Sequence, residues 1–202
     1  MPKTKPAALL FCACLTLLFG RAFAAETFTG IKGAETGELT FNGNLACYAY
    51  QKYTVISRSS GDSAGSDILV KSKGRKAAKC DWNERGAALS LKNSGADYFS
   101  GLYSNFLFVD SGTGPSGRRL TVYDLEKSTS AYSTEYTGEA ALEKDALRFW
   151  LPSGAPKTGD NCPRREEWEK QGLTPSLEED VRLDLKTLKL LRSGWLRCTP
   201  RQ

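Results

Sequence analysis

The residues best placed to do chemistry follow an apolar run, where the chain reads Asp110-Ser111-Gly112-Thr113-Gly114. The chain contains no histidine, which excludes Ser-His-Asp and Cys-His catalysis and removes the usual imidazole ligands of zinc and copper. Beyond the first 24 residues, no S-x-x-K motif supports a Ser-Lys pair. Carboxylate chemistry centred on Asp110 is therefore the catalytic alternative that the sequence leaves open.

The stretch from Phe106 to Thr113 resembles the loop of aspartic proteases, in which an apolar strand runs into Asp-Ser/Thr-Gly-Ser/Thr. The resemblance implies two such aspartates that share one proton and activate a water. This chain has one copy of the motif and no match to the family's later apolar-apolar-Gly segment, so a catalytic pair would require a homodimer. In the other interpretation, Asp110 caps a turn and the glycines adopt positive φ angles in a hairpin loop.

Two further patterns have simpler interpretations. Residues Gly112 to Gly117 fit G-x-G-x-x-G, but the dinucleotide fingerprint requires a helix to follow, and residues 118–125 have the pattern of a strand. A glycosidase needs two carboxylates that face each other across a cleft, about 5–10 Å apart. The adjacent acids of two clusters do not show this arrangement: Glu166/Glu167/Glu169 and Glu178/Glu179/Asp180. We expect both clusters to be solvated surface, and we expect no cofactor and no metal.

A dense basic segment is the one candidate binding patch. Its members are Lys71, Lys73, Arg75 and Lys76, with Lys79 close behind. Such a patch could contact an anionic partner, either an acidic protein face or a phosphate-bearing lipid. The alternative is a solvated turn, because most charge runs have no further role.

The first 24 residues have the features of a secretory signal peptide. Lys3 and Lys5 precede an apolar run that is too short to span a membrane, and Ala22-Phe23-Ala24 is an A-x-A cleavage pattern. Cleavage near Ala24 would leave residues 25–202 as a single β-rich domain. The sequence thus predicts a protein of the periplasm or the extracellular space, with no membrane span.

Cleavage would also change the charge and the cysteine count. Losing Lys3, Lys5 and Arg21 lowers the net charge from +5 to +2, which is too small an excess for a typical nucleic-acid-binding protein. Four cysteines would remain, and an exported protein is expected to pair them in one of three connectivities. We favour Cys47–Cys80 and Cys162–Cys198, because these pairs are neighbours in sequence order and close the shorter loops.

The pattern of β-branched and aromatic residues predicts a mainly β fold, an antiparallel sandwich or partly open barrel of about eight strands. The expected strands cover residues 39–41, 45–56, 67–73, 102–109, 120–125, 131–136, 146–151 and 181–185. The hairpin formed by residues 102–109 and 120–125 is expected at the centre. One short helix is predicted over residues 164–171, capped by Asp160 or Asn161 and ended by Gly172.

These features favour an exported, disulfide-stabilised binding protein, with another protein of the envelope or outside the cell as its partner. One concrete version is an inhibitor or immunity-type protein that acts against an envelope-targeting enzyme. The alternatives are a carboxylate hydrolase, working as an aspartic-peptidase-like dimer through Asp110, and a structural accessory protein of the envelope. The sequence does not predict an oligomeric state.

Overall fold

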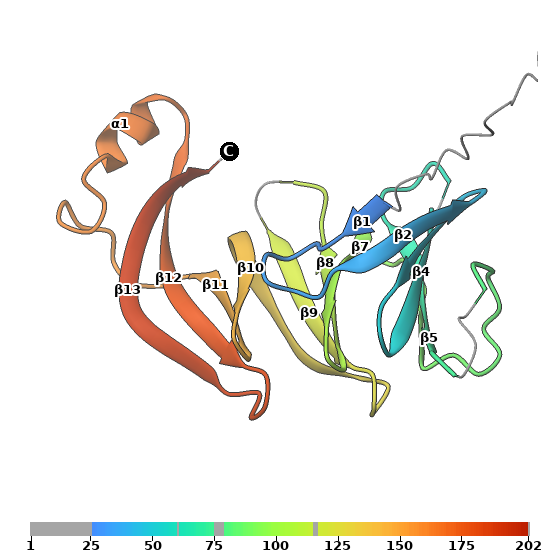
Figure 1. Cartoon of the computed structure of the whole chain (residues 1–202). Coiled ribbons are helices and arrows are strands. Elements are labelled where there is room, and N and C mark those ends of the chain that lie inside the picture. The colour runs from blue at the N-terminus through green and yellow to red at the C-terminus, as the bar shows by residue number, and fades with distance from the viewer. Residues whose placement is uncertain (1–25, 60, 75–78, 115–116, 202) are drawn as a thin grey trace, which may run out of the picture.

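The computed structural model describes residues 26–59, 61–74, 79–114 and 117–201. The expected signal peptide therefore lies outside the described residues, as do Arg75 and Lys76 of the basic segment. Two antiparallel sheets, of six and seven strands, make up the fold, and each sheet follows the chain in order from strand to neighbouring strand (Figure 1).

The first sheet holds β1 to β6: Glu26–Phe28, Gly37–Asn42, Leu45–Ala49, Tyr53–Ser59, Ser66–Ser72 and Leu89–Leu91. The second holds β7 to β13: Asp97–Tyr103, Phe106–Ser111, Arg118–Asp124, Thr129–Glu143, Ala146–Pro152, Thr174–Asp184 and Leu190–Arg201. One helix, α1 (Arg165–Lys170), lies between β11 and β12. The predicted mainly β class, antiparallel pairing, single short helix and both disulfides are confirmed.

The estimate of eight strands was too low because two of the expected strands are hairpins and because β1, β6 and β13 were not among them. Residues 45–56 form β3 and β4, joined by a tight turn, and residues 102–109 divide between β7 and β8 at Ser104 (φ +57°). Apolar residues on both arms made each hairpin resemble one long strand. The predicted central hairpin is observed as the antiparallel β8–β9 pair, which runs in register from Phe106↔Asp124 to Ser111↔Arg119.

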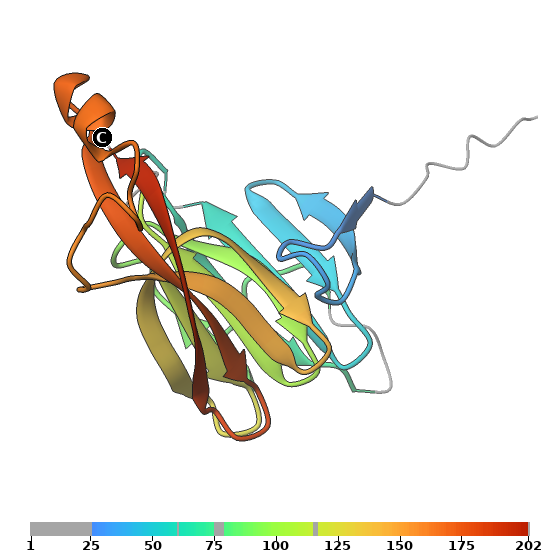
Figure 2. The ribbon, with the colours of Figure 1, turned by 90° about the vertical axis from the view of Figure 1, so that its left-hand side faces the viewer.

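Two apolar clusters account for the layering. One joins the two sheets, packing Val55, Ile68 and Val70 of the first against Leu102 and Leu107 of the second. The other lies on the inner face of the second sheet, whose strong curvature is visible in Figures 1 and 2. Its members alternate along the strands with outward-facing residues, as a sheet with one buried face requires.

Two turns of the second sheet repeat each other. In the turn after β9, Asp124 Oδ1 accepts hydrogen bonds from the backbone N–H groups of Glu126 and Lys127, and in the turn after β12, Asp184 Oδ1 accepts those of the two residues that follow Leu185. Each turn also contains one residue with φ near +55°. The short sequence similarity between residues 120–125 and 181–185 thus corresponds to the same local structure.

The helix differs in detail from its prediction. Arg164 is the N-cap residue and no side chain caps the helix, while Asn161 Oδ1 instead accepts a hydrogen bond from the Thr158 N–H. Gly172 (φ +75°) ends the helix as expected. Trp168 is buried against Cys162, Leu177 and Cys198, so one ring and one disulfide hold this short, mostly charged helix on the sheet.

Candidate functional site

The second sheet opens where β10 passes from one neighbour to the next. β10 pairs with β9 up to Tyr136↔Arg118 and with β11 at Thr137↔Trp150 and again at Ala141↔Arg148. Residues 138–140 of β10 have no partner residue in either of these described strands. The segment between β1 and β2 partly fills the opening, because Lys32 forms a parallel bridge with Ala141 and its carbonyl accepts the Leu142 N–H.

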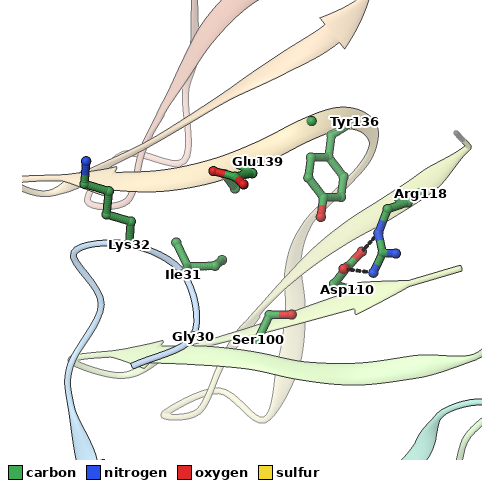
Figure 3. Close-up of a pocket in the computed structure, with 10 residues that line it drawn as sticks. Gly30, Ile31, Lys32, Ser100, Asp110, Arg118, Tyr136 and Glu139 are labelled. Carbon is green, nitrogen blue, oxygen red and sulfur yellow. Dashed lines mark hydrogen bonds and ion pairs between the residues drawn. The ribbon is translucent and has the colours of Figure 1, made fainter. Parts of the chain in front are cut away.

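A groove follows this opening and consists of two adjoining hollows of about 650 and 520 Å³. They share Lys32, Gly138 and Glu139. One end of the groove is lined by Asp110, Arg118 and Tyr136 (Figure 3), and the other end by Arg148, Trp150 and Arg197. We refer to these two hollows together as the β10 groove.

Asp110 is not the turn cap that one interpretation predicted. It lies on β8 with a side chain that is 12 % exposed, and both of its carboxylate oxygens accept hydrogen bonds from Arg118, one from Nε at 3.0 Å and the other from Nη2. The strand pairing explains this contact, because Asp110 and Arg118 stand on neighbouring strands beside the loop that joins them. Gly112 and Gly117 in that loop have positive φ angles, as expected.

This pairing bears on the aspartic-protease resemblance. The hydroxyl end of Tyr136 points toward the pair in Figure 3, and burial together with the Asp110 charge raises the pKa of Tyr136 to about 12. A carboxylate held at both oxygens by a guanidinium is not free to bind and activate a water in the manner of a protease dyad. The geometry around Asp110 is that of a structural ion pair at one end of a groove.

The glycine-rich motif forms no dinucleotide site, and within the described part of the basic segment Lys71 is engaged in an ion pair. Residues Arg118–Asp124 are strand β9, so the helix that a dinucleotide fingerprint needs is absent from this position. Lys71 is 15 % exposed and donates to the Asp81 carboxylate at 2.7 Å, and the Lys73 N–H donates to the Lys52 carbonyl. Nearby, Trp82 packs beside the Cys47–Cys80 disulfide, as predicted, and Arg58 lies 4.0 Å over its ring.

The second acidic cluster was assigned wrongly. Glu178 and Asp180 were expected on a solvated surface, but they are 2 % and 5 % exposed. They occupy alternate positions of β12 that face away from the apolar cluster, and long side chains from both neighbouring strands cover them. The first cluster is exposed as expected, with Glu167 and Glu169 on α1 paired to Arg164 and Arg165.

Each buried carboxylate is fully engaged. Glu178 accepts hydrogen bonds from Arg197 Nε (2.8 Å), Thr199 Oγ1 (2.6 Å) and Arg201 Nη2 (2.7 Å). Burial alone would raise the pKa of Glu178, but these hydrogen bonds outweigh it and hold the pKa below its ordinary value. Asp180 accepts from Arg148 Nε at 2.7 Å and from Nη2 at 3.2 Å.

Two tryptophans lie above this charged layer. The Arg197 guanidinium stacks 3.9 Å over the Trp150 ring, and the Trp195 ring lies 5.8 Å from Trp150, centroid to centroid. Trp195 is 63 % exposed and Leu191, on the same strand, is 58 % exposed. The register pairs Arg148 with Arg182 and Arg182 with Leu191, which places all of these side chains on one face of the sheet.

We call this surface the tryptophan face. Its members are Arg148, Trp150, Arg182, Leu191, Trp195 and Arg197. No motif signals the face, because its members are scattered over three strands and only the register brings them together. The alternation of Arg148 and Trp150 with buried Phe149 was the one available sign that β11 carries a polar and aromatic outer side.

Neither a protein-family model, nor a curated protein, nor a solved structure matches this chain. Within the described residues, no helix has the length and hydropathy of a membrane span. The same residues contain no group of three or more histidine, cysteine, aspartate or glutamate side chains placed to hold a metal ion.

Proposed function

We propose that this protein is an exported binding protein that recognises another protein through the tryptophan face. The supporting observation is the exposed Trp195 ring, stacked beside Trp150 and the Arg197 guanidinium over a buried, fully hydrogen-bonded carboxylate. Tryptophan and arginine are the residue types that dominate binding energy at interfaces. Trp150 and Arg197 are held in place before binding by their stacking and by the hydrogen bond from Arg197 to Glu178, so binding a partner has to order few further side chains.

The kind of partner follows from the expected compartment. Two disulfides and a signal-like leader are compatible with a protein exported to an oxidising compartment. The carboxylates of the tryptophan face and of the Asp110 end of the β10 groove are held in ion pairs, which suits recognition better than catalysis. We therefore propose an inhibitor or immunity-type role against an enzyme that acts on the envelope.

A native pull-down tests this function. The oxidised mature chain is used as bait in an envelope extract of the source organism, beside two variants that each lose one exposed aromatic ring. Trp195→Ala changes the tryptophan face, whereas Phe41→Ala removes a ring that is 65 % exposed on β2 of the other sheet. We expect a stoichiometric partner with wild type and Phe41→Ala and its loss with Trp195→Ala. The absence of any stoichiometric partner would contradict the proposal.

A further inference from the structure

The β10 groove is a built feature rather than a gap between mobile side chains. Its floor is the part of β10 without a strand partner, and its rim is fixed by backbone hydrogen bonds from Ile31 N–H to the Ser100 carbonyl and from Leu142 N–H to the Lys32 carbonyl. Each of its two hollows, of about 650 and 520 Å³, is within the size range of preformed small-molecule sites, about 300–1,000 Å³. Gly138 (φ +68°) places no side chain in the groove. A Cβ at this position would lie 2.9 Å from the Arg197 guanidinium, which is closer than a normal contact.

The charges along the groove nearly balance, because its lining holds four cations, Lys32, Arg118, Arg148 and Arg197, and three anions, Asp110, Glu139 and Glu143. Arg118 pairs with Asp110, Arg148 with Glu143 and Asp180, and Arg197 with Glu178. Lys32 and Glu139, one of each sign, form no ion pair with any residue that the structure describes. Because the lining has an excess of only one charge and most of its charged groups are paired, it offers little net attraction to phosphates, to polyanions or to cations.

The groove nevertheless presents both hydrogen-bond donors and acceptors. The guanidinium and ammonium groups can only donate hydrogen bonds and the carboxylates can only accept them. A hydroxyl does both, so a ligand rich in hydroxyls can satisfy the two kinds of group in turn. Arg197 covers part of the Trp150 ring, and the part of this side chain that lines the groove supplies apolar area for the C–H groups of a sugar ring.

We propose that the β10 groove binds a neutral saccharide of two or three rings, with Glu139 and Lys32 as its hydrogen-bonding residues and Trp150 as its apolar contact. This site goes beyond the protein-binding function and does not depend on it. The two sites share only Trp150 and its neighbours Arg148 and Arg197, and Trp195 does not line the groove.

Tryptophan fluorescence of the oxidised mature chain tests this site. The chain is titrated with chitotriose, cellotriose and maltotriose up to about 10 mM, a range that reveals even weak binding. We expect a saturable change with at least one of the three. Glu139→Gln and Lys32→Ala should each weaken it about tenfold, while Glu135→Gln, an exposed change on the same strand, leaves it within twofold.

The outcomes separate this site from the protein-binding function. Trp195→Ala should abolish capture of the protein partner and retain the saccharide titration. No response to any of the three saccharides would overturn the proposal, and so would binding that both Glu139→Gln and Lys32→Ala leave unchanged. If reduced casein, an unfolded polypeptide, binds in a Glu139-dependent way and the saccharides do not, the groove is a peptide site instead.

Discussion

Single side chains decide what the carboxylates of this protein can do. Asp110 stands in the most motif-like string of the chain, yet its two oxygens are held by Arg118. Glu178 and Asp180 look like surface acids in the sequence and are buried beneath arginines. In each case the partner stands on a neighbouring strand, and it is strand register, absent from local sequence, that brings the two together.

The Asp110–Arg118 pair gives the first prediction. Arg118→Ala leaves a carboxylate that is only 12 % exposed without its partner and should lower the free energy of unfolding by about 2–3 kcal/mol. Urea denaturation measures the change. Arg119→Ala, at an adjacent side chain that is 59 % exposed, should stay within about 0.5 kcal/mol. Equal effects of the two substitutions would show that the pair contributes nothing.

Glu178 gives a pH-dependent prediction. Its pKa is lower in the folded state than in the unfolded chain, so its contribution to stability is present above the unfolded value and is lost as the pH falls through the folded value. Glu178→Gln should therefore lower the melting temperature at pH 7, with a difference from wild type that shrinks as the pH approaches 3. A difference that stays constant across this range would contradict the assignment.

At the scale of elements, the sequence predicts types better than boundaries. Alternating apolar residues revealed β8, β9 and β11, and two of the four mature cysteines marked where α1 is attached. The tight turn at Ser104 was missed because it contains neither the glycine nor the proline that usually signals a turn. The tryptophan face was missed for the related reason that it exists only once β11, β12 and β13 are paired.

The Cys162–Cys198 disulfide gives a prediction for one element. It ties the segment before α1 to β13, beside Trp168 and Leu177, and spans 36 residues. Replacing both cysteines with serine should lower stability by about 3–4 kcal/mol and speed proteolysis within residues 153–173. The matched change at Cys47 and Cys80 should leave cleavage in that segment unchanged. Equal cleavage in both variants would mean that the disulfide does not restrain α1.

For the whole molecule, the chain presents two different surfaces from one curved sheet. The inner face of the seven-stranded sheet is apolar, and the outer face of its β11, β12 and β13 carries arginines and tryptophans over buried carboxylates. The sequence predicted the fold class and the disulfides, and a binding role that stays a prediction, whereas the proposed binding surface could be located only in the structure. The role of Arg75 and Lys76 remains a prediction, since both lie outside the described residues.

The most direct test of the account is the affinity of the captured partner for two single-ring variants. Calorimetry should show that Trp195→Ala raises the Kd about 30-fold or more, as expected for an exposed aromatic anchor worth about 2 kcal/mol. Phe41→Ala should leave the Kd within about twofold, because surface residues outside the interface contribute little. Equal Kd values for Trp195→Ala and wild type would contradict the claim that the tryptophan face is the binding surface.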